Sequence, residues 1–174
     1  MLEEILTNNN VVESINNNLD ELLILIPELK FMIGFDHKHP HHHLDVWEHT
    51  LYALSLSENN FEIRLALLLH DIGKPFSYQE GEIRHYNGHA LKSYEISKKI
   101  LDRFNFENNF KDEVYYLIKY HDTPISKKDI EDNYDLCVKR YKIQVCDALA
   151  HHPEKLEKRI KYLKRTRNMI KANH

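Results

Sequence analysis

Residues that break or bend helices are scarce in this chain. Its 174 residues include four glycines and five prolines, and these two residue types most often mark turns and loops. Strict alternation of apolar and polar residues, which is typical of a half-buried strand, is almost absent. We therefore expect an all-α fold in which helices are joined by short connections.

Disulfide bonds and membrane-spanning segments are not expected either. The two cysteines, Cys137 and Cys146, lie on one predicted helix, with a separation of roughly 13 Å that is too long for a disulfide. The apolar run from Leu22 to Ile26 stops at Pro27, far short of the ~18 residues of a membrane span. The acidic start, MLEEIL, lacks the layout of a signal peptide. We expect a cytoplasmic protein with no membrane partner.

The charge balance gives no general attraction to polyanions. The net charge is −3 with histidine counted as neutral, which indicates no overall preference for nucleic acid. One segment differs, because the last predicted helix has eight basic residues from Lys155 to Lys171. They form either a solvated face or a contact surface for RNA or for a phosphate-rich part of a substrate.

Helix-capping residues predict where the helices begin. Asp45, with Glu48 three residues later, is typical of a capping box and predicts a helix through Ser57. Asn60 caps a segment that is apolar nearly all round as far as His70, as expected of a central buried helix. Further helices are predicted at 88–104, at 107–120, after Ser126, at 134–150 and at 153–170.

The chain shows no linker and no internal repeat. Residues 1–34 are also predicted to be helical, although they contain two asparagine runs. We expect them to form a helical extension packed on a main body of residues 35–174, so that the whole is one globular unit. A polar loop around Glu80-Gly81 is compatible with a small hairpin.

Thirteen histidines are the most unusual feature of the composition. Several of them, with two aspartates, fall at the edges of different predicted helices: His49, His70, Asp71, His89, His121 and Asp147. Imidazole and carboxylate together suit first-row transition metals. A charged Asp71 at the end of an apolar helix is costly to bury unless it is paired or bound to a cation. The alternative is that His70 is a satisfied core histidine and Asp71 caps the following segment.

Four short motifs resemble one known family. They are HHLDVWEHTL (42–51), RLALLLHDIGKP (64–75), HYNGHA (85–90) and CDALA (146–150). In this order they resemble the HD-domain superfamily of metal-dependent phosphohydrolases, and in particular the HD domain of bacterial CCA-adding tRNA nucleotidyltransferases. The resemblance covers about residues 24–153 and implies a helical bundle. Residues 1–34 cannot hold the nucleotidyltransferase head of those enzymes, so we do not expect this chain to add nucleotides.

The resemblance implies a ligand set for one or two divalent ions. His49, His70, Asp71 and Asp147 match the family's core ligands, and His89 and His121 match the additional histidines of members that hold a second ion, with Asp71 between the two. Mn, Fe, Co, Ni and Zn all remain open. The alternatives are an exposed ring at the start of a helix for His89 and a helix C-terminal histidine for His121.

The resemblance also implies a reaction, with Asp71 and Lys74 as its catalytic residues. Lys74 would face the substrate phosphate, and His85 and Arg140 are further candidates for phosphate binding; each has the alternative of an ordinary surface residue. The expected activity is hydrolysis of a phosphomonoester or phosphodiester, in a small and nucleotide-related molecule, by a metal-activated hydroxide. The rival interpretations are a metal-loaded module that binds a nucleotide or RNA without turnover, and a structural metal site.

Overall fold

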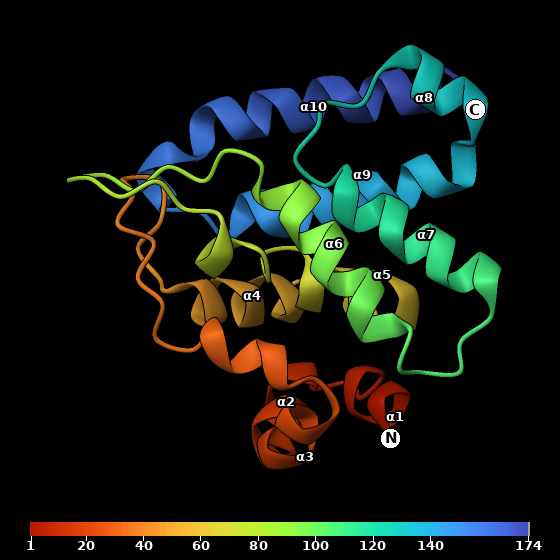
Figure 1. The fold of residues 1–174 in the computed structure, drawn as a ribbon. Coiled ribbons are helices and arrows are strands. Elements are labelled where there is room, and N and C mark those ends of the chain that lie inside the picture. The colour runs from red at the N-terminus through yellow and green to blue at the C-terminus, as the bar shows by residue number, and fades with distance from the viewer. Residues whose placement is uncertain (174) are drawn as a thin grey trace.

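The computed structural model describes residues 1–173, and within them it contains only helices as regular elements (Figure 1). The first part comprises α1 (Leu2–Leu6), α2 (Val11–Asn17), α3 (Leu19–Leu25) and a 3-10 helix, η1 (Pro27–Phe31). The central part comprises α4 (Val46–Ser55), α5 (Phe61–Leu69), η2 (Lys74–Phe76), α6 (His89–Leu101) and α7 (Asn108–Lys119). The last part comprises α8 (Lys127–Asp132), α9 (Tyr134–Leu149), η3 (Pro153–Lys155) and α10 (Leu156–Ala172). The expected all-α class is confirmed.

The predicted helix starts agree with the caps that the structure contains. Asp45 and Glu48 form a reciprocal capping box at α4, and Ser126 forms one at α8 with Asp129. The Asn60 side chain accepts the amide of Ile63 at the start of α5. The predicted hairpin at 79–85 is reduced to an isolated bridge between Gln79 and His85.

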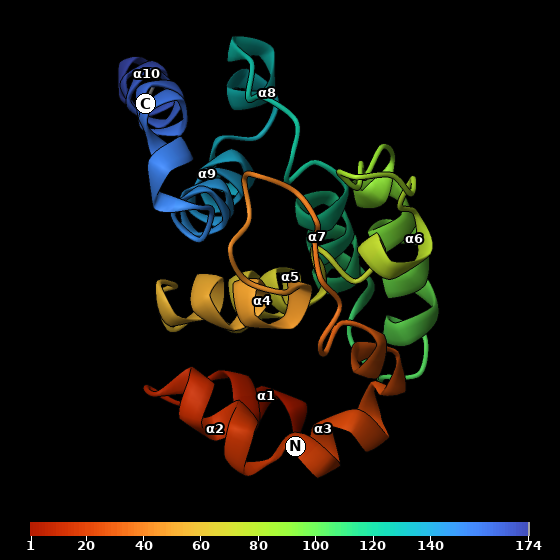
Figure 2. The same cartoon turned by 90° about the vertical axis from the view of Figure 1, so that its left-hand side faces the viewer.

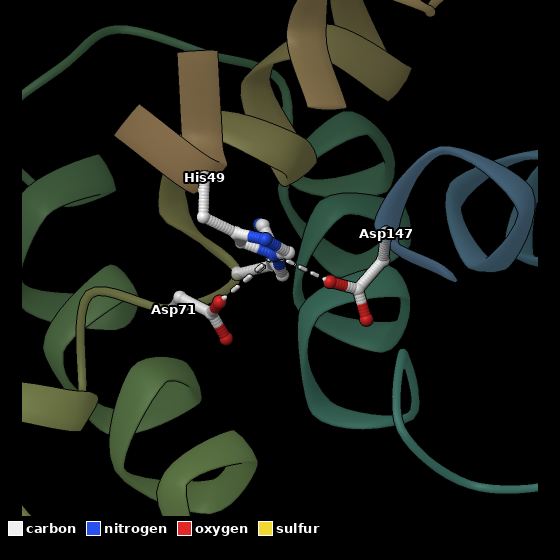
Figure 3. Close-up of side chains that lie close together, drawn as sticks. His49, Asp71 and Asp147 are labelled. Atoms are coloured by element: carbon white, nitrogen blue, oxygen red, sulfur yellow. Dashed lines mark hydrogen bonds and ion pairs between the residues drawn. The ribbon is translucent and has the colours of Figure 1, made fainter. Parts of the chain in front are cut away.

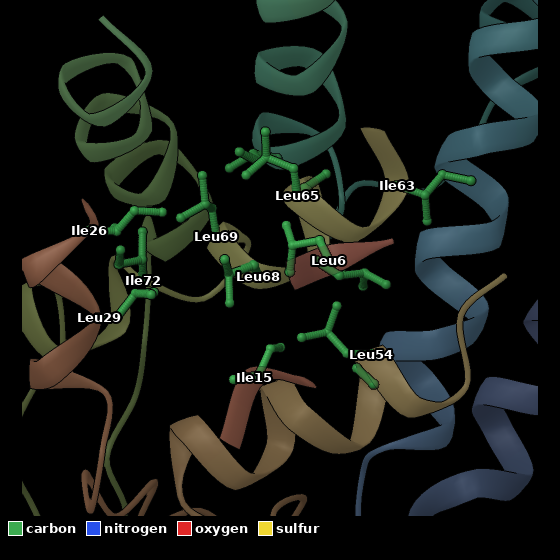
Figure 4. Packing of buried hydrophobic residues seen from close by; sticks show 14 of the residues in the cluster. Leu6, Ile15, Ile26, Leu29, Leu54, Ile63, Leu65, Leu68, Leu69 and Ile72 are labelled. Atoms are coloured by element: carbon green, nitrogen blue, oxygen red, sulfur yellow. The ribbon is translucent and has the colours of Figure 1, made fainter. Parts of the chain in front are cut away.

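Helix α5 lies at the centre of the molecule. Every residue from Glu62 to Leu69 is buried, and the helix packs against α4, α7 and α9. Figure 4 shows Leu65, Leu68 and Leu69 surrounded by apolar side chains from other elements. Each fully buried leucine contributes about 1.5–3 kcal/mol relative to an exposed one, so this helix is the main source of hydrophobic stabilisation at the site.

The N-terminal helices share the same core. Leu6, Ile15 and Leu29 are fully buried and belong to the hydrophobic cluster of α4 and α5. Figures 1 and 2 show α1–α3 beneath α4, on the side away from α10. Arg64 fastens α1 to α5, because its guanidinium donates to the carbonyls of Leu6 and Asn8 at 2.7 Å each. The division of the chain at residue 34 stays a prediction.

Both cysteines lie on α9 as buried free thiols, in agreement with the expected absence of a disulfide between them. None of the helices in residues 1–173 has the length and apolar character needed to cross a bilayer.

Candidate metal centre

Three helices and the C-terminal ends of two others bring the predicted ligand residues together. His49 is part of α4, His70 caps the C-terminus of α5 with Asp71 immediately after it, and Asp147 lies near the end of α9. The donor atoms of these four side chains all lie within 4.8 Å of one another. Asp71 forms a second such group with His89, the first residue of α6, and His121, which follows α7.

The first group is compact. The Nε2 atom of His49 lies 2.8 Å from Asp147 Oδ1 and 3.5 Å from Asp71 Oδ2, so that the ring stands between the two carboxylates (Figure 3). The Nε2 atom of His70 lies 3.2 Å and 3.3 Å from the same two oxygens. Two imidazoles and two carboxylates therefore face one point.

The other oxygen of Asp71 faces the second group. Asp71 Oδ1 lies 3.4 Å from Nε2 of His89 and 3.7 Å from Nε2 of His121. One carboxylate thus presents Oδ2 to the histidines of α4 and α5, and Oδ1 to those of α6 and the loop after α7. This arrangement agrees with the bridging position that the resemblance implies for Asp71.

Backbone carbonyls determine the tautomer of all four histidines. Each Nδ1 lies within hydrogen-bond distance of a carbonyl oxygen, which can only accept. The distances are 3.1 Å for His49 to Ala150, 2.5 Å for His70 to Leu67, 3.0 Å for His89 to Tyr86 and 2.6 Å for His121 to Ile118. In the neutral form of each ring the Nε2 lone pair is therefore turned to the centre, which is the orientation that metal-ligating histidines require.

Two features fit a bound cation. The Nε2 atoms of His89 and His121 lie 3.2 Å apart, and with Nδ1 as the donor in both rings neither neutral Nε2 can donate to the other. Asp71 Oδ2 is buried and accepts no hydrogen bond of good geometry, with the Lys74 ammonium at 3.2 Å as its charged neighbour. A cation between these lone pairs satisfies both groups, and the mixed imidazole and carboxylate donors suit first-row metals.

The electrostatics concentrate negative charge at the same point. Burial opposes the ionisation of Asp71, but His70 and Lys74 outweigh it and hold the pKa of Asp71 well below its usual value. Burial likewise opposes the ionisation of Asp147, yet His49 and His70 keep its pKa low. Burial, with His70 and His89 nearby, lowers the pKa of His121 to about 3. Both carboxylates are thus ionised, and His121 is neutral as a ligand must be.

Lys74 and His85 line one cavity with three of the candidate ligands, and their expected contact with phosphate stays a prediction. Lys74 is buried, with Nζ 3.2 Å from Asp71 Oδ2 and 3.0 Å from Nε2 of His37. Both Lys74 and His85 line a cavity of about 240 Å³ that also contains Asp71, His89 and Asp147; we call it the small cavity. A larger hollow, the wide cavity, measures about 550 Å³ and lies between α10 and residues 121–124.

Arg140 is not brought to either cavity. It is buried, and its guanidinium donates to the carbonyls of Tyr120, Thr123 and Pro124 and to the Tyr116 hydroxyl. The structure therefore does not support the expected phosphate contact of Arg140. Its observed contacts instead hold the loop that carries His121.

Sequence reasoning missed several residues around the centre. His37 accepts a hydrogen bond from Lys74 and stacks on His42, with ring centroids 3.8 Å apart. His151 and Arg159 line the small cavity. The HKHPHHH run at 37–43 predicts a loop near the cleft with His42 or His43 lining it, and His42 does line the small cavity, so the same run was a usable signal for His37. An arginine on a helix with eight basic residues gives no local indication of its position.

Comparison with known proteins agrees with this geometry. The chain is 36% identical over 107 residues to the CC-adding tRNA nucleotidyltransferase of Thermus thermophilus, a match that covers 56% of this chain and 24% of that protein. It is 33% identical over 95 residues to the multifunctional CCA protein of Shewanella frigidimarina, covering 52% and 23%. The chain thus spans about a quarter of the length of these relatives. The model of the HD domain family matches residues 41–171, and the chain belongs to that family.

Proposed function

We propose that this chain is a metal-dependent phosphohydrolase that cleaves a phosphomonoester or phosphodiester. In this proposal His49, His70, Asp71 and Asp147 hold one divalent ion, and Asp71, His89 and His121 hold a second. The observation that carries the proposal is the placement of Asp71, whose two oxygens face two separate histidine groups. Membership of the HD domain family supports it.

Bound divalent ions would supply Lewis-acid chemistry, by lowering the pKa of water and offsetting charge on phosphate oxygens. The protein's own contribution begins with Lys74. Burial, followed by the nearby Lys74 charge, lowers the pKa of His37 to about 2, so His37 is a neutral acceptor for the Lys74 ammonium. The ammonium is therefore held at the floor of the small cavity, where it can donate to a non-bridging oxygen of phosphate.

The nature of the substrate is supported by the relatives. The name of the Thermus thermophilus relative describes a tRNA nucleotidyltransferase, which favours a nucleotide-related phosphate ester. We do not extend nucleotide addition to this chain. The rival proposal is a metal-loaded module that binds a nucleotide or RNA without turnover, and it is separated from the first by measured hydrolysis of monoester and diester substrates.

The test combines metal analysis with a substrate panel. The full chain is reconstituted with Mn, Fe, Co, Ni or Zn and assayed with p-nitrophenyl phosphate, its bis ester, a nucleoside monophosphate and a dinucleotide. We expect metal-dependent turnover that a chelator removes and that Asp71→Asn abolishes. If the chain binds metal but turns over no ester, the metal-loaded binding module is the remaining interpretation. If it binds no metal, both proposals are contradicted.

A further inference from the structure

Arg159 has an unused guanidinium beside the candidate metal centre. It lies near the start of α10 and is half-buried. Among residues 1–173 it has no hydrogen-bond or ion-pair partner, whereas Arg64, Arg103 and Arg140 each bind a carbonyl or a carboxylate. Its guanidinium can therefore bind an anion without first losing another contact, so Arg159 is a candidate for binding a ligand.

The position of Arg159 joins the two cavities. Three residues line both the small and the wide cavity, namely Asp122, Asp147 and Arg159. The two cavities therefore adjoin, and Arg159 is the one basic residue in the described part of the chain that lines both, beside the acidic Asp122 and Asp147. Its charge reaches both sides, because after burial it contributes to the lowered pKa of His41 at the wide cavity and of His151 at the small one.

The two cavities differ in size, and each fits a different part of one ligand. The small cavity, about 240 Å³, falls below the roughly 300–1,000 Å³ of sites that enclose small molecules, and it holds Lys74 and the candidate metal ligands. The wide cavity, about 550 Å³, falls within that range. A phosphate fits the first and an attached organic group fits the second.

The walls of the wide cavity suit packing against an organic ring. Pro124, Tyr162 and Leu163 supply apolar surface. The Tyr162 hydroxyl donates to Gln144 at 2.8 Å, and Gln144 donates to the Thr123 carbonyl at 2.8 Å. Since these polar groups already have partners, binding there would depend on shape and stacking.

Arg159 lies beyond the ligand shell. Lys74 lies 3.2 Å from Asp71, but Arg159 forms no ion pair with Asp71 or Asp147 in the described part of the chain. Lys74 is thus placed for the phosphate at the metal centre, and Arg159 for an anionic group between that phosphate and the wide cavity. A guanidinium binds phosphate with two parallel hydrogen bonds.

We propose that Arg159 binds a second phosphate of the substrate, that the wide cavity takes its nucleoside, and that the substrate is therefore a nucleotide with at least two phosphates. The inference rests on the proposed function for the phosphate at the metal centre. It makes Arg159 a specificity-determining residue. Lys74 differs, because its removal would weaken the binding of every phosphate ester.

The test is calorimetric binding to the full, Mn-loaded chain. The probes are adenosine 5′-(α,β-methylene)diphosphate, which cannot be cleaved between its phosphates, and the analogue of adenosine 5′-monophosphate in which a methylene group replaces the 5′ ester oxygen, which cannot release phosphate. We expect Arg159→Gln to weaken the diphosphate analogue about tenfold or more, as loss of a charged hydrogen-bonding group does, and to leave the monophosphate analogue within about threefold. Arg159→Lys should fall between. The matched control is Arg165→Gln, an exposed arginine on the same helix that lines neither cavity.

Equal weakening of both probes would place Arg159 on the phosphate at the metal centre and overturn the inference, as would an unchanged affinity or a wild-type chain without preference for the diphosphate analogue. Thermal unfolding of each variant identifies loss of fold. If the chain prefers the diphosphate analogue but hydrolyses no ester, the proposed function alone is contradicted. If the chain hydrolyses esters and Arg159→Gln binds both probes as the wild type does, this inference alone is contradicted.

Discussion

Gly73 lies directly against the first turn of α6: a Cβ atom at Gly73 would come 2.7 Å from the carbonyl oxygen of His89. The same atom would lie 2.5 Å from the backbone nitrogen of Ser93, whose hydroxyl accepts the Gly73 amide at 2.8 Å. The turn that carries Asp71 and the helix that begins with His89 are therefore in backbone contact, and this contact sets the distance between the two candidate ligands.

Gly73→Ala should separate these ligands. Because the clashing atoms are backbone, α6 must shift, and we expect a loss of about 1–3 kcal/mol in the free energy of unfolding together with less metal bound per chain. Denaturant unfolding and elemental analysis measure the two effects. Gly81→Ala is the control, since its Cβ would meet only the Ile83 carbonyl, at 3.3 Å. Full metal content in Gly73→Ala would show that the spacing does not matter.

His121→Ala should lower the metal content of the saturated protein by one ion per chain. His121 faces only the Oδ1 side of Asp71, so the group on the other side stays complete. Asp71→Asn should impair both groups, because Asp71 belongs to each. The exposed His43 provides a control, His43→Ala, with unchanged content. An unaltered stoichiometry in His121→Ala contradicts the two-ion proposal.

Lys74→Ala should reduce kcat/KM while the metal content stays intact. Its ammonium is held beside Asp71 by His37, and removal of one positioned donor to a charged transition state costs about 10²–10³ in rate. Steady-state kinetics and elemental analysis on the same sample test this, with the exposed Lys99→Ala as the control. Loss of metal, or full activity, would assign Lys74 another role.

Arg140→Ala should destabilise the fold. Its buried guanidinium binds three carbonyls of the loop after α7 and pairs with Asp129 at 3.3 Å. We expect a loss of about 3 kcal/mol or more, because hydrogen bonds to charged groups are strong and their buried partners stay unpaired. Lys142→Ala, which removes an exposed ion pair with Glu58, should cost less than about 1 kcal/mol. Equal losses in denaturant unfolding would contradict the buried role.

Glu62 should make stability fall as the pH rises from about 4.5 to about 7. Burial, and then a side-chain hydrogen bond that protonated Glu62 donates to the Glu113 carboxylate, raise the pKa of Glu62 from 4.5 to about 7, although Lys139 lies 3.0 Å away. In this window the unfolded chain has released a proton that the folded chain still holds, so the slope of unfolding free energy against pH is negative. The pKa of Glu113 is lowered, chiefly by its hydrogen bond with Glu62. The stability that Glu113 contributes is therefore lost only as the pH decreases below about 4.5, outside this window.

Glu62→Gln should flatten that slope, with an effect of order 1 kcal/mol across the window. Unfolding free energies at several pH values, with Glu82→Gln in the exposed loop as the control, measure it. A wild-type chain equally stable at both ends of the window would show that Glu62 ionises normally.

Local chemistry was sufficient to predict the helices. A cap acts within four residues of itself, so Asp45, Asn60 and Ser126 indicated the starts of α4, α5 and α8 directly from the sequence. The apolar run before His70 likewise identified the buried central helix, since burial on all sides needs no knowledge of the neighbours.

The sequence by itself determined the helical class, the helix starts and the residue types of a metal centre, because each depends on short-range pattern. Only the tertiary structure decided which long side chains reach that centre. Arg140 and Arg159 both lie on helices with several basic residues. The Arg140 guanidinium donates hydrogen bonds to carbonyls of the loop after α7, whereas Arg159 lies at the junction of two cavities without such a partner among residues 1–173. Such differences depend on partners tens of residues away, and so does the contact of Gly73 with His89.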